Sequence, residues 1–422
     1  MKYDLIVAGG GFAGVGAAIA AARQGLSVLL FDKGNCLGGA ASNALVMPFM
    51  KHSTMLNGEK FFLSRGIFAE IKEKLEKMTD FDGDYYPYSY YFHDENLKLL
   101  LNRMAQEAGV NLLYGVYLSE VEQSGEKIDS VTLSGVSGKI KLEADYFIDA
   151  TGDGNLAFLA GCEYMLGREN DNQCQPMTLC FRVANVDMDL YSEQKPLFNP
   201  IYKEAKEKGL FSNPREDVLS FKTLVDGVVH FNTTRVIRKN PTNPFDRTQA
   251  EIEAREQVFE IFDFLKKNFS AFKNSSIIST AAETGVRESR MIKGDYLLTK
   301  DDLLACKKFP DAIAAANYDI DIHSPDGAGT SHYFFEEGTW YTIPYRCLHP
   351  VGKENLLVAG RCISSDHDSQ ASYRIMPIVC TIGEAAGVAV AVAKKAGVGV
   401  GDADVSEIQK IITQTGGFTG LL

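Results

Sequence analysis

The sequence has few of the patterns that mark metal-binding or disulfide-rich proteins. Its 422 residues include eight cysteines, but no CxxC pair and no grouping of cysteine with histidine at zinc-like spacing. We therefore expect no metal site, and we expect most cysteines to be reduced, small and buried. No low-complexity linker and no internal repeat interrupts the chain.

The sequence also lacks an excess of positive charge and a long uninterrupted apolar segment. It carries 55 acidic and 43 basic side chains, a formal charge of -12, which argues against a broad surface for nucleic acids or anionic membranes. Glycines interrupt the longest apolar stretches, so we expect no membrane span. Residues 1–4 lead directly into an apolar strand without a signal-peptide region, and the expected location is the cytoplasm.

What the sequence does contain is typical of a globular protein with more than one domain. Hydrophobic residues make up 45% of the chain and charged residues 23%, close to the globular average. The length suits two or three connected domains. After about residue 165 the composition changes to mixed strands, one amphipathic helix and loops rich in Asn, Pro and Asp, and near residue 346 a buried strand pattern returns.

The first 34 residues predict a strand, a glycine turn, a helix and a second strand. In VAGGGFAGVGAA, Gly9, Gly11 and Gly14 have the GxGxxG spacing, which gives a tight turn, close backbone approach to a pyrophosphate and close helix packing. The helix N-terminus adds partial positive charge. Asp32 ends the second strand, where its carboxylate can accept hydrogen bonds from a ribose. These residues predict a dinucleotide but do not distinguish NAD from FAD.

Three later segments place further turns beside the same nucleotide. Gly38 and Gly39 in GNCLGGAAS let the backbone pass close to a pyrophosphate, a ribityl chain or a ring. A second strand ends in DATGDG, which puts Asp153 near the sugar or the pyrophosphate. A third strand ends in NLLVAGRC, and RIMPIVCTIGEAAG begins a helix whose N-terminus can face a negatively charged ring such as reduced flavin.

With these motifs the chain resembles the FAD-dependent oxidoreductases of the glutathione-reductase-like class, nearest a bacterial family related to the succinate dehydrogenase and fumarate reductase flavoproteins. The most specific segments are TGVRESRMIKGDY, FPDAIAAANYDIDIH, IPYRCLHPVGKENLLVAGRCIS and RIMPIVCTIGEAAGVAVAVA. The resemblance implies an α/β fold, with a FAD-binding Rossmann-type domain over 1–165 and 346–422. An α+β substrate domain is expected as an insertion over 166–345.

The resemblance also implies FAD in an extended form between the domains, with the Leu118 backbone meeting the adenine. The residues expected to contact FAD are Gly9, Gly11, Phe12, Ala13, Gly14, Asp32, Lys33, Gly38, Gly39, Ala40, Ser42, Leu118, Ala150, Thr151, Gly152, Asp153, Gly360, Arg361, Met376 and Pro377. The segment after the second glycine pair has no histidine for a covalent flavin bond, and a thioether at Cys36 is the remaining covalent alternative. We expect FAD to be bound non-covalently.

The chain departs from neighbouring groups in two respects. It has one cysteine where glutathione-reductase-type enzymes carry a redox-active CxxxxC, and it has no second GxGxxG for a nicotinamide nucleotide. A disulfide reductase is therefore not expected. Electrons are expected to enter from the substrate or from an electron-transfer partner.

Four residues are candidates for catalysis. Arg287 and Arg290 in GVRESR are spaced to share a helical face and to bind an anion or the flavin edge. The alternative is a structural ion-pair network with Glu288 between them. Arg374 adjoins the C-terminal flavin segment. His367, between two aspartates, is a candidate base, with a surface-loop histidine as the alternative. The aromatic residues at 332–341 and the tyrosine run at 84–93 either line the substrate site or pack in the domain seam.

The function expected from these motifs is a FAD-dependent oxidoreductase. Hydride is expected to pass between flavin N5 and a small polar substrate at the domain interface. A flavin-dependent hydroxylase and a flavoprotein subunit of an electron-transfer complex remain the alternatives.

Overall fold

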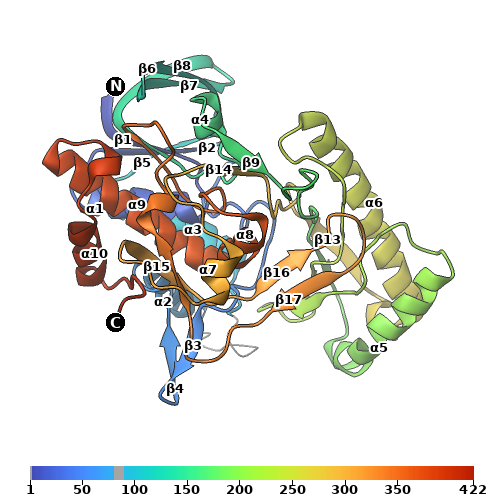
Figure 1. Ribbon diagram of the computed structural model, residues 1–422. Helices are drawn as coiled ribbons and strands as arrows, with labels where there is room; N and C mark the ends of the chain where they lie inside the picture. Colours follow the sequence, from blue (N-terminus) through green and yellow to red (C-terminus); the bar gives the residue numbers. More distant parts are fainter. Residues whose placement is uncertain (1, 80–89) are drawn as a thin grey trace.

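The computed structural model describes residues 2–79 and 90–422 (Figure 1), so most of the tyrosine run at 84–93 lies outside the described residues. Its main element is a seven-stranded sheet. The strand order is β5 (Asn111–Tyr114), β2 (Val28–Asp32), β1 (Lys2–Ala8), β8 (Gly138–Asp149), β7 (Lys127–Gly135) and β6 (Tyr117–Ser124), with β19 (Leu356–Val358) paired to β8. The pairs β5–β2, β2–β1, β1–β8 and β8–β19 are parallel, whereas β8–β7 and β7–β6 are antiparallel.

The unit formed by β1, α1 (Phe12–Arg23) and β2 agrees with the sequence prediction. Residues 5–8 of β1 are fully buried, as expected for a strand in a parallel sheet that is covered on both faces. Helix α1 ends before Gly25, whose φ of 92° is the left-handed conformation of a helix C-terminal cap. The predicted βαβ unit is confirmed.

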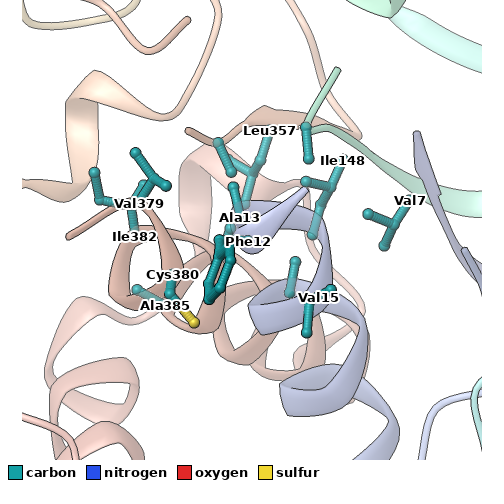
Figure 2. Close-up of a cluster of buried hydrophobic side chains, with 14 of the residues drawn as sticks. Val7, Phe12, Ala13, Val15, Ile148, Leu357, Val379, Cys380, Ile382 and Ala385 are labelled. Atoms are coloured by element: carbon teal, nitrogen blue, oxygen red, sulfur yellow. The ribbon is translucent and has the colours of Figure 1, made fainter. Parts of the chain in front are cut away.

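Helix α9 (Met376–Ala396) packs unusually closely along α1. A Cβ atom on Gly383 or Gly387 would overlap a carbonyl oxygen of α1, at Ala13 and Ala17 respectively, so only glycine permits this helix separation. Figure 2 shows this contact with Ile148 and Leu357 of the adjoining strands beside it. The side chains that meet between the helices are Phe12, Ala13, Val15, Val379, Cys380, Ile382 and Ala385.

Helix α9 is long and apolar enough to cross a membrane by length and composition. All of the apolar window that meets this test is buried inside the protein. The helix is therefore accounted for as the central helix of the protein core.

Further helices and short 3-10 turns complete the covering of the main sheet. The helices are α2 (Ile67–Thr79), α3 (Asp94–Glu107), α4 (Asn155–Leu159), α7 (Lys300–Leu304), α8 (His367–Tyr373) and α10 (Val405–Gln414). The 3-10 turns are η2 (Tyr345–Cys347) and η3 (Val400–Asp402) here, and η1 (Ser270–Phe272) in the second sheet unit.

A second, antiparallel sheet forms its own hydrophobic core. Its strand order is β11 (Ser220–Lys222), β12 (Val229–Phe231), β10 (Phe181–Ala184) and β13 (Ser276–Thr280). Helices α5 (Met188–Glu207) and α6 (Pro244–Asn268) accompany it, on the opposite side of Figure 1 from α10. The amphipathic helix predicted in this region is confirmed as α6, which the Asn243 side chain caps. The buried cluster spans Met177 to Ala281 and adds Leu45, a shorter range than the predicted 166–345.

Four two-stranded ladders connect these units. They are β3 (Ser53–Leu56) with β4 (Glu59–Phe62), β9 (Tyr164–Leu166) with β14 (Arg290–Ile292), β15 (Ala312–Ala316) with β18 (Tyr341–Pro344), and β16 (Ile320–His323) with β17 (Thr330–Tyr333). Buried residues from Ile292 to Ile343 belong to the core of the main sheet. The chain thus returns to the first core well before the predicted return at 346.

The pairing of Arg287 and Arg290 on one helical face is wrong. Arg290 begins strand β14, and residues 285–289 are not helical. Backbone pairing of Gly285 with Thr178 and of β14 with β9 fixes this stretch on both sides. The two arginines therefore point to different partners.

Candidate functional site

The glycine turn between β1 and α1 forms an open cradle. Gly9 has a φ of 100°, and a Cβ there would lie 2.5 Å from the Ala150 oxygen at the end of β8. Gly14 packs against the Gly9 carbonyl so closely that a side chain would overlap it. By contrast, a Cβ on Gly11 would meet no protein atom within 4 Å. The open space therefore lies in front of the N-terminus of α1, where a phosphate is favoured.

Asp32 joins two glycine turns at the end of β2. Its carboxylate accepts hydrogen bonds from the backbone N–H groups of Gly10 and Gly34, both at 2.6 Å. The Val116 N–H donates to the Asp32 carbonyl at 3.3 Å. This bond brings the start of β6, with Leu118 two residues further on, to the edge of the cradle. Leu118 itself is partly buried against the main core, and its adenine contact stays a prediction.

The second glycine pair packs onto the first turn. The Gly38 N–H donates to the Gly10 carbonyl at 2.8 Å, and a Cβ on Gly39 would lie 2.9 Å from the Gly11 Cα. Ala40 and Ser42 follow in the same turn, and the Ser42 hydroxyl donates to the Leu37 carbonyl. The segment 38–42 thus closes one side of the cradle with backbone atoms.

Cys36 sits beside this turn as a thiol. Burial raises its pKa, and its sulfur donates to Asn43 Oδ1 at 3.6 Å. Because the thiolate is the nucleophilic form, this environment disfavours a thioether with a cofactor.

Two aspartates, Asp149 and Asp153, lie at the end of β8 and make different contacts. Asp149 is fully buried and accepts hydrogen bonds from Thr151 N, at 3.0 Å, and from Ala157 N, at 2.9 Å. It therefore shapes the turn that carries Ala150, Thr151 and Gly152. Burial outweighs these bonds and raises its pKa.

Asp153 is bound by Arg361 at 2.6 Å and by the Ser289 hydroxyl at 2.7 Å. Burial opposes its ionisation, but the charge of Arg361 and these hydrogen bonds together lower its pKa. The carboxylate therefore stays ionised. Its predicted contact with the sugar or pyrophosphate stays a prediction.

The return segment completes the cradle. Gly360 follows β19, and a Cβ there would lie 3.1 Å from the Ala13 Cβ at the start of α1. Met376 and Pro377 occupy the first turn of α9. The predicted residues of β1, β2, β8 and β19 thus meet at the carboxyl ends of parallel strands, where open α/β sheets bind nucleotides. The open space at Gly11 and the surrounding glycine contacts fit an extended dinucleotide.

Lys33, which was expected to contact FAD, forms an ion pair within the protein. Its ammonium group pairs with Glu283 at 2.5 Å, and Glu283 also pairs with Arg247 of α6 at 2.9 Å. These contacts tie the end of β2 to the second sheet unit. Lys33 lines a groove of about 560 Å³ there together with Asp153 and Arg247.

Next to the cradle, residues 287–289 connect three parts of the protein. The Arg287 guanidinium donates to the Thr178 hydroxyl at 2.6 Å, and the Ser289 hydroxyl donates to Asp153. Between them, Glu288 is fully buried and pairs with His367 Nδ1 at 2.7 Å. The predicted base is therefore oriented by Glu288 rather than by its neighbouring aspartates, one of which caps α8.

His367 is neither a surface-loop residue nor fully satisfied. Its side chain is 12% exposed, and its Nε2 atom is buried without a hydrogen-bond partner among the described residues. A neutral imidazole that donates from Nδ1 leaves Nε2 as an acceptor. This atom is suited to take a proton from a bound molecule.

Arg290 makes contacts that stabilise the turn after β8. Its guanidinium lies 4.1 Å from the centre of the Phe158 ring and donates to the Asp153 carbonyl and to Asn155 Oδ1, both at 3.1 Å. A cation–π contact and two hydrogen bonds from Nη1 hold this side chain, while its Nε atom is buried without a hydrogen-bond partner among the described residues. Nothing in these contacts supports a catalytic role for Arg290.

Several residues that sequence analysis missed lie around the same cluster. They include Gln175, Gln370 and Asp321, each with a buried polar atom that lacks a partner in the described part of the chain. His323 contacts Arg235 at 2.9 Å, and burial followed by the charge of Arg287 lowers its pKa to about 3. No local pattern identifies Gln175, Gln370 and Asp321 because their segments lie far apart in the sequence.

The second sheet carries two further polar residues that sequence analysis did not identify as candidates, Arg182 and His230. Arg182 lies directly across from His230 in the ladder of β10 and β12 and pairs with Asp94 at 2.8 Å. His93 precedes the first turn of α3, and Asp94 in that turn binds Arg182. His230 is fully buried, and burial lowers its pKa to about 3.

Comparison with known proteins gives both sequence and structural relatives. The digeranylgeranylglycerophospholipid reductase 2 of Methanothermobacter thermautotrophicus is 28% identical over 201 residues, 45% of this chain and about half (49%) of that protein. A geranylgeranyl bacteriochlorophyll reductase-like structure from Thermoplasma acidophilum is 13% identical, with a TM-score of 0.47, covering 98% of this chain and 83% of that one. The flavin-dependent brominase Bmp2 is 14% identical, with a TM-score of 0.46 and the same coverage, 98% and 83%.

The family relation extends over nearly the whole sequence. The model of the family described as FAD dependent oxidoreductase matches residues 4–412. The chain therefore belongs to the FAD dependent oxidoreductase family, and its cofactor is FAD.

Proposed function

We propose that this oxidoreductase moves a hydride between flavin N5 and a small polar substrate bound beside residues 287–289. The observation that carries this proposal is the buried pair of Glu288 and His367. The Nε2 atom of His367 has no hydrogen-bond partner among the described residues. Ser289, which follows Glu288, donates a hydrogen bond to Asp153 of the cradle and so connects the pair to the cradle. A polar group that is buried without a partner is costly unless a ligand uses it.

The protein groups and the cofactor have separate tasks. FAD, when bound, supplies the hydride chemistry. For oxidation of an alcohol or amine, His367 Nε2 accepts the hydroxyl or amine proton as the C–H hydride leaves the carbon, so that a C=O or C=N bond forms. Glu288 holds the imidazole by its Nδ1 atom, and Gln175 N steadies Glu288 with a hydrogen bond of 2.8 Å. Reduction is the same sequence in reverse.

Within the family, we assign the chain to the glutathione-reductase-like structural class, with the second sheet as the substrate-binding insertion. The arrangement of the βαβ unit, the second sheet and the return through β19 supports this assignment. No redox-active cysteine pair stands beside the second glycine turn, and the sequence has no second GxGxxG. The electrons are therefore exchanged with the substrate or with a partner protein.

The first test is spectroscopic. The purified protein is expected to be yellow, to release its flavin on acid precipitation, and to be bleached anaerobically by one pool of small polar metabolites. A protein that cannot be loaded with FAD, or a loaded protein that no alcohol or amine pool bleaches and no carbonyl or imine pool reoxidises, would contradict the proposal.

The second test uses variants of His367. His367→Gln is expected to bind FAD normally and to slow anaerobic flavin reduction by about 100-fold, the usual contribution of a general base. His349→Gln is the matched control, because His349 Nδ1 also pairs with a carboxylate, Asp295 at 2.6 Å. Equal reduction rates in the two variants would remove His367 from the reaction.

A further inference from the structure

Arg287 is a cation without a neutralising partner. Its guanidinium donates to the Pro176 carbonyl at 2.7 Å and to the Thr178 hydroxyl at 2.6 Å, and both acceptors are uncharged. Within residues 2–79 and 90–422, no carboxylate lies at ion-pair distance from it. The residue as a whole is partly exposed.

Arg374 is also poorly neutralised. Its side chain is 9% exposed, and its nearest carboxylate oxygen, Asp321 Oδ2, is 3.9 Å away. That oxygen also lies 3.4 Å from His323 Nε2. One nitrogen of Arg374, Nη1, is buried with no hydrogen-bond partner among the described residues.

Arg287 lies near the positive charge of Arg374. The Gln370 side chain, one helical turn before Arg374, reaches the Arg287 carbonyl at 2.8 Å. Burial, followed by the charge of Arg374, lowers the pKa of Arg287 to about 9. Ordered water can satisfy their hydrogen bonds, but it cannot neutralise their charge.

Neutral hydrogen-bonding groups border the same region. Gln370, one helical turn before Arg374, donates to the Arg287 carbonyl at 2.8 Å and keeps its Oε1 atom unpartnered. Gln175 keeps its Nε2 donor unpartnered as well. The carboxylates of Glu288 and Asp321 lie at the edge of this cluster. They disfavour a doubly charged ligand such as a phosphate dianion, whereas a single negative charge fits.

From this arrangement we infer that the substrate carries a carboxylate group and that Arg287 and Arg374 bind it, with Gln175 as a neutral donor beside them. The inference rests on the proposed function, because it assigns the substrate class of the same site. Arginine is suited to the role since its planar guanidinium group binds a carboxylate through two parallel hydrogen bonds. The carboxylate would then hold the reacting carbon beside His367.

Titration calorimetry of the FAD-loaded protein tests the inference without turnover. Propionate is expected to bind saturably and to shift the flavin absorbance, whereas the neutral analogue propionamide is expected to bind at least ten times more weakly. Methanesulfonate and inorganic phosphate separate a planar carboxylate site from a general anion site. Equal binding of propionamide, tighter binding of phosphate, or no saturable binding of propionate would each overturn the inference.

Variants locate the site within the protein. Arg287→Gln and Arg374→Gln are each expected to weaken propionate binding by about 10- to 100-fold, since each loses a charged hydrogen bond. Arg374→Lys should recover part of the affinity. Arg346→Gln is the control, because Arg346 already pairs with Asp311 at 2.9 Å. Unchanged propionate affinity in both glutamine variants would contradict the assignment, and flavin content and melting temperature show whether each variant is folded.

The same data separate this inference from the proposed function. If propionate binds as expected but no carboxylate-bearing alcohol or amine reduces the flavin, the anion site stands and the hydride proposal fails. If neutral substrates reduce the flavin equally fast in the wild type and in both glutamine variants, the hydride proposal stands and the carboxylate inference fails.

Discussion

Glu384, in the middle of α9, gives the sharpest stability prediction. Its side chain is buried against Gly66, and it accepts a hydrogen bond from the Ile67 N–H at 2.9 Å at the start of α2. Burial raises its pKa from the ordinary 4.5 to about 7, although the helix N–H and the nearby Arg23 act in the opposite direction. We therefore expect ionisation of Glu384 to destabilise the folded protein.

The sign and size of this effect follow from linkage. Because the folded state holds the proton more tightly than the unfolded chain, stability is greatest below about pH 4.5 and falls as the pH rises to about 7. A pKa difference of this size corresponds to about 3 kcal/mol of unfolding free energy. Glu384→Gln keeps an acceptor for Ile67 N and cannot ionise. It should match the wild type near pH 4 and be more stable by up to ~3 kcal/mol at pH 8.

The assay is urea unfolding of the FAD-loaded protein at several pH values and a fixed FAD concentration. Glu70→Gln is the control with the opposite sign. Glu70 pairs with Arg23 and Lys74, and although burial opposes its ionisation these partners lower its pKa, so its loss should destabilise the protein at pH 8. If Glu384→Gln keeps the wild-type pH slope, or is less stable at pH 8, the reasoning about this buried carboxylate is wrong.

Three further predictions concern glycines and an arginine. Gly11→Ala should fold with wild-type melting behaviour yet lose most of its flavin, since its Cβ meets no protein atom; full retention of flavin by absorbance would contradict the position of the phosphate site. Gly387→Ala should lower the unfolding free energy by about 1–3 kcal/mol, because its Cβ would overlap the Ala17 carbonyl; a neutral result in urea would show that α1 and α9 can separate. Arg290→Ala should reduce the melting temperature while leaving propionate affinity unchanged, and a loss of affinity without destabilisation would restore it to the site.

The glycine turn and the strand ends that form the cradle were accessible to prediction because their signals are local. Gly9, Gly11 and Gly14 lie in one turn, and Asp32 ends the next strand of the same βαβ unit. The backbone geometry needed there restricts the residue types strongly. The amphipathic pattern that predicted α6 is local in the same way.

The candidate reacting groups were less accessible to prediction because tertiary contacts decide their surroundings. His367 is flanked by Asp366 and Asp368 in sequence, yet its partner is Glu288, 79 positions away. Asp366 instead caps α8. In the same way, the three-residue spacing of Arg287 and Arg290 would place them on one helical face, but the backbone pairing on either side of this segment leaves it non-helical.

The non-helical backbone at 287–289 allows one short segment to contact two sites. Glu288 pairs with His367, while its neighbours contact Thr178 and Asp153. A helix would spread these three side chains over most of its circumference. The helical prediction for this segment was wrong. The observed non-helical conformation places the proposed base, the proposed carboxylate site and the cradle side by side.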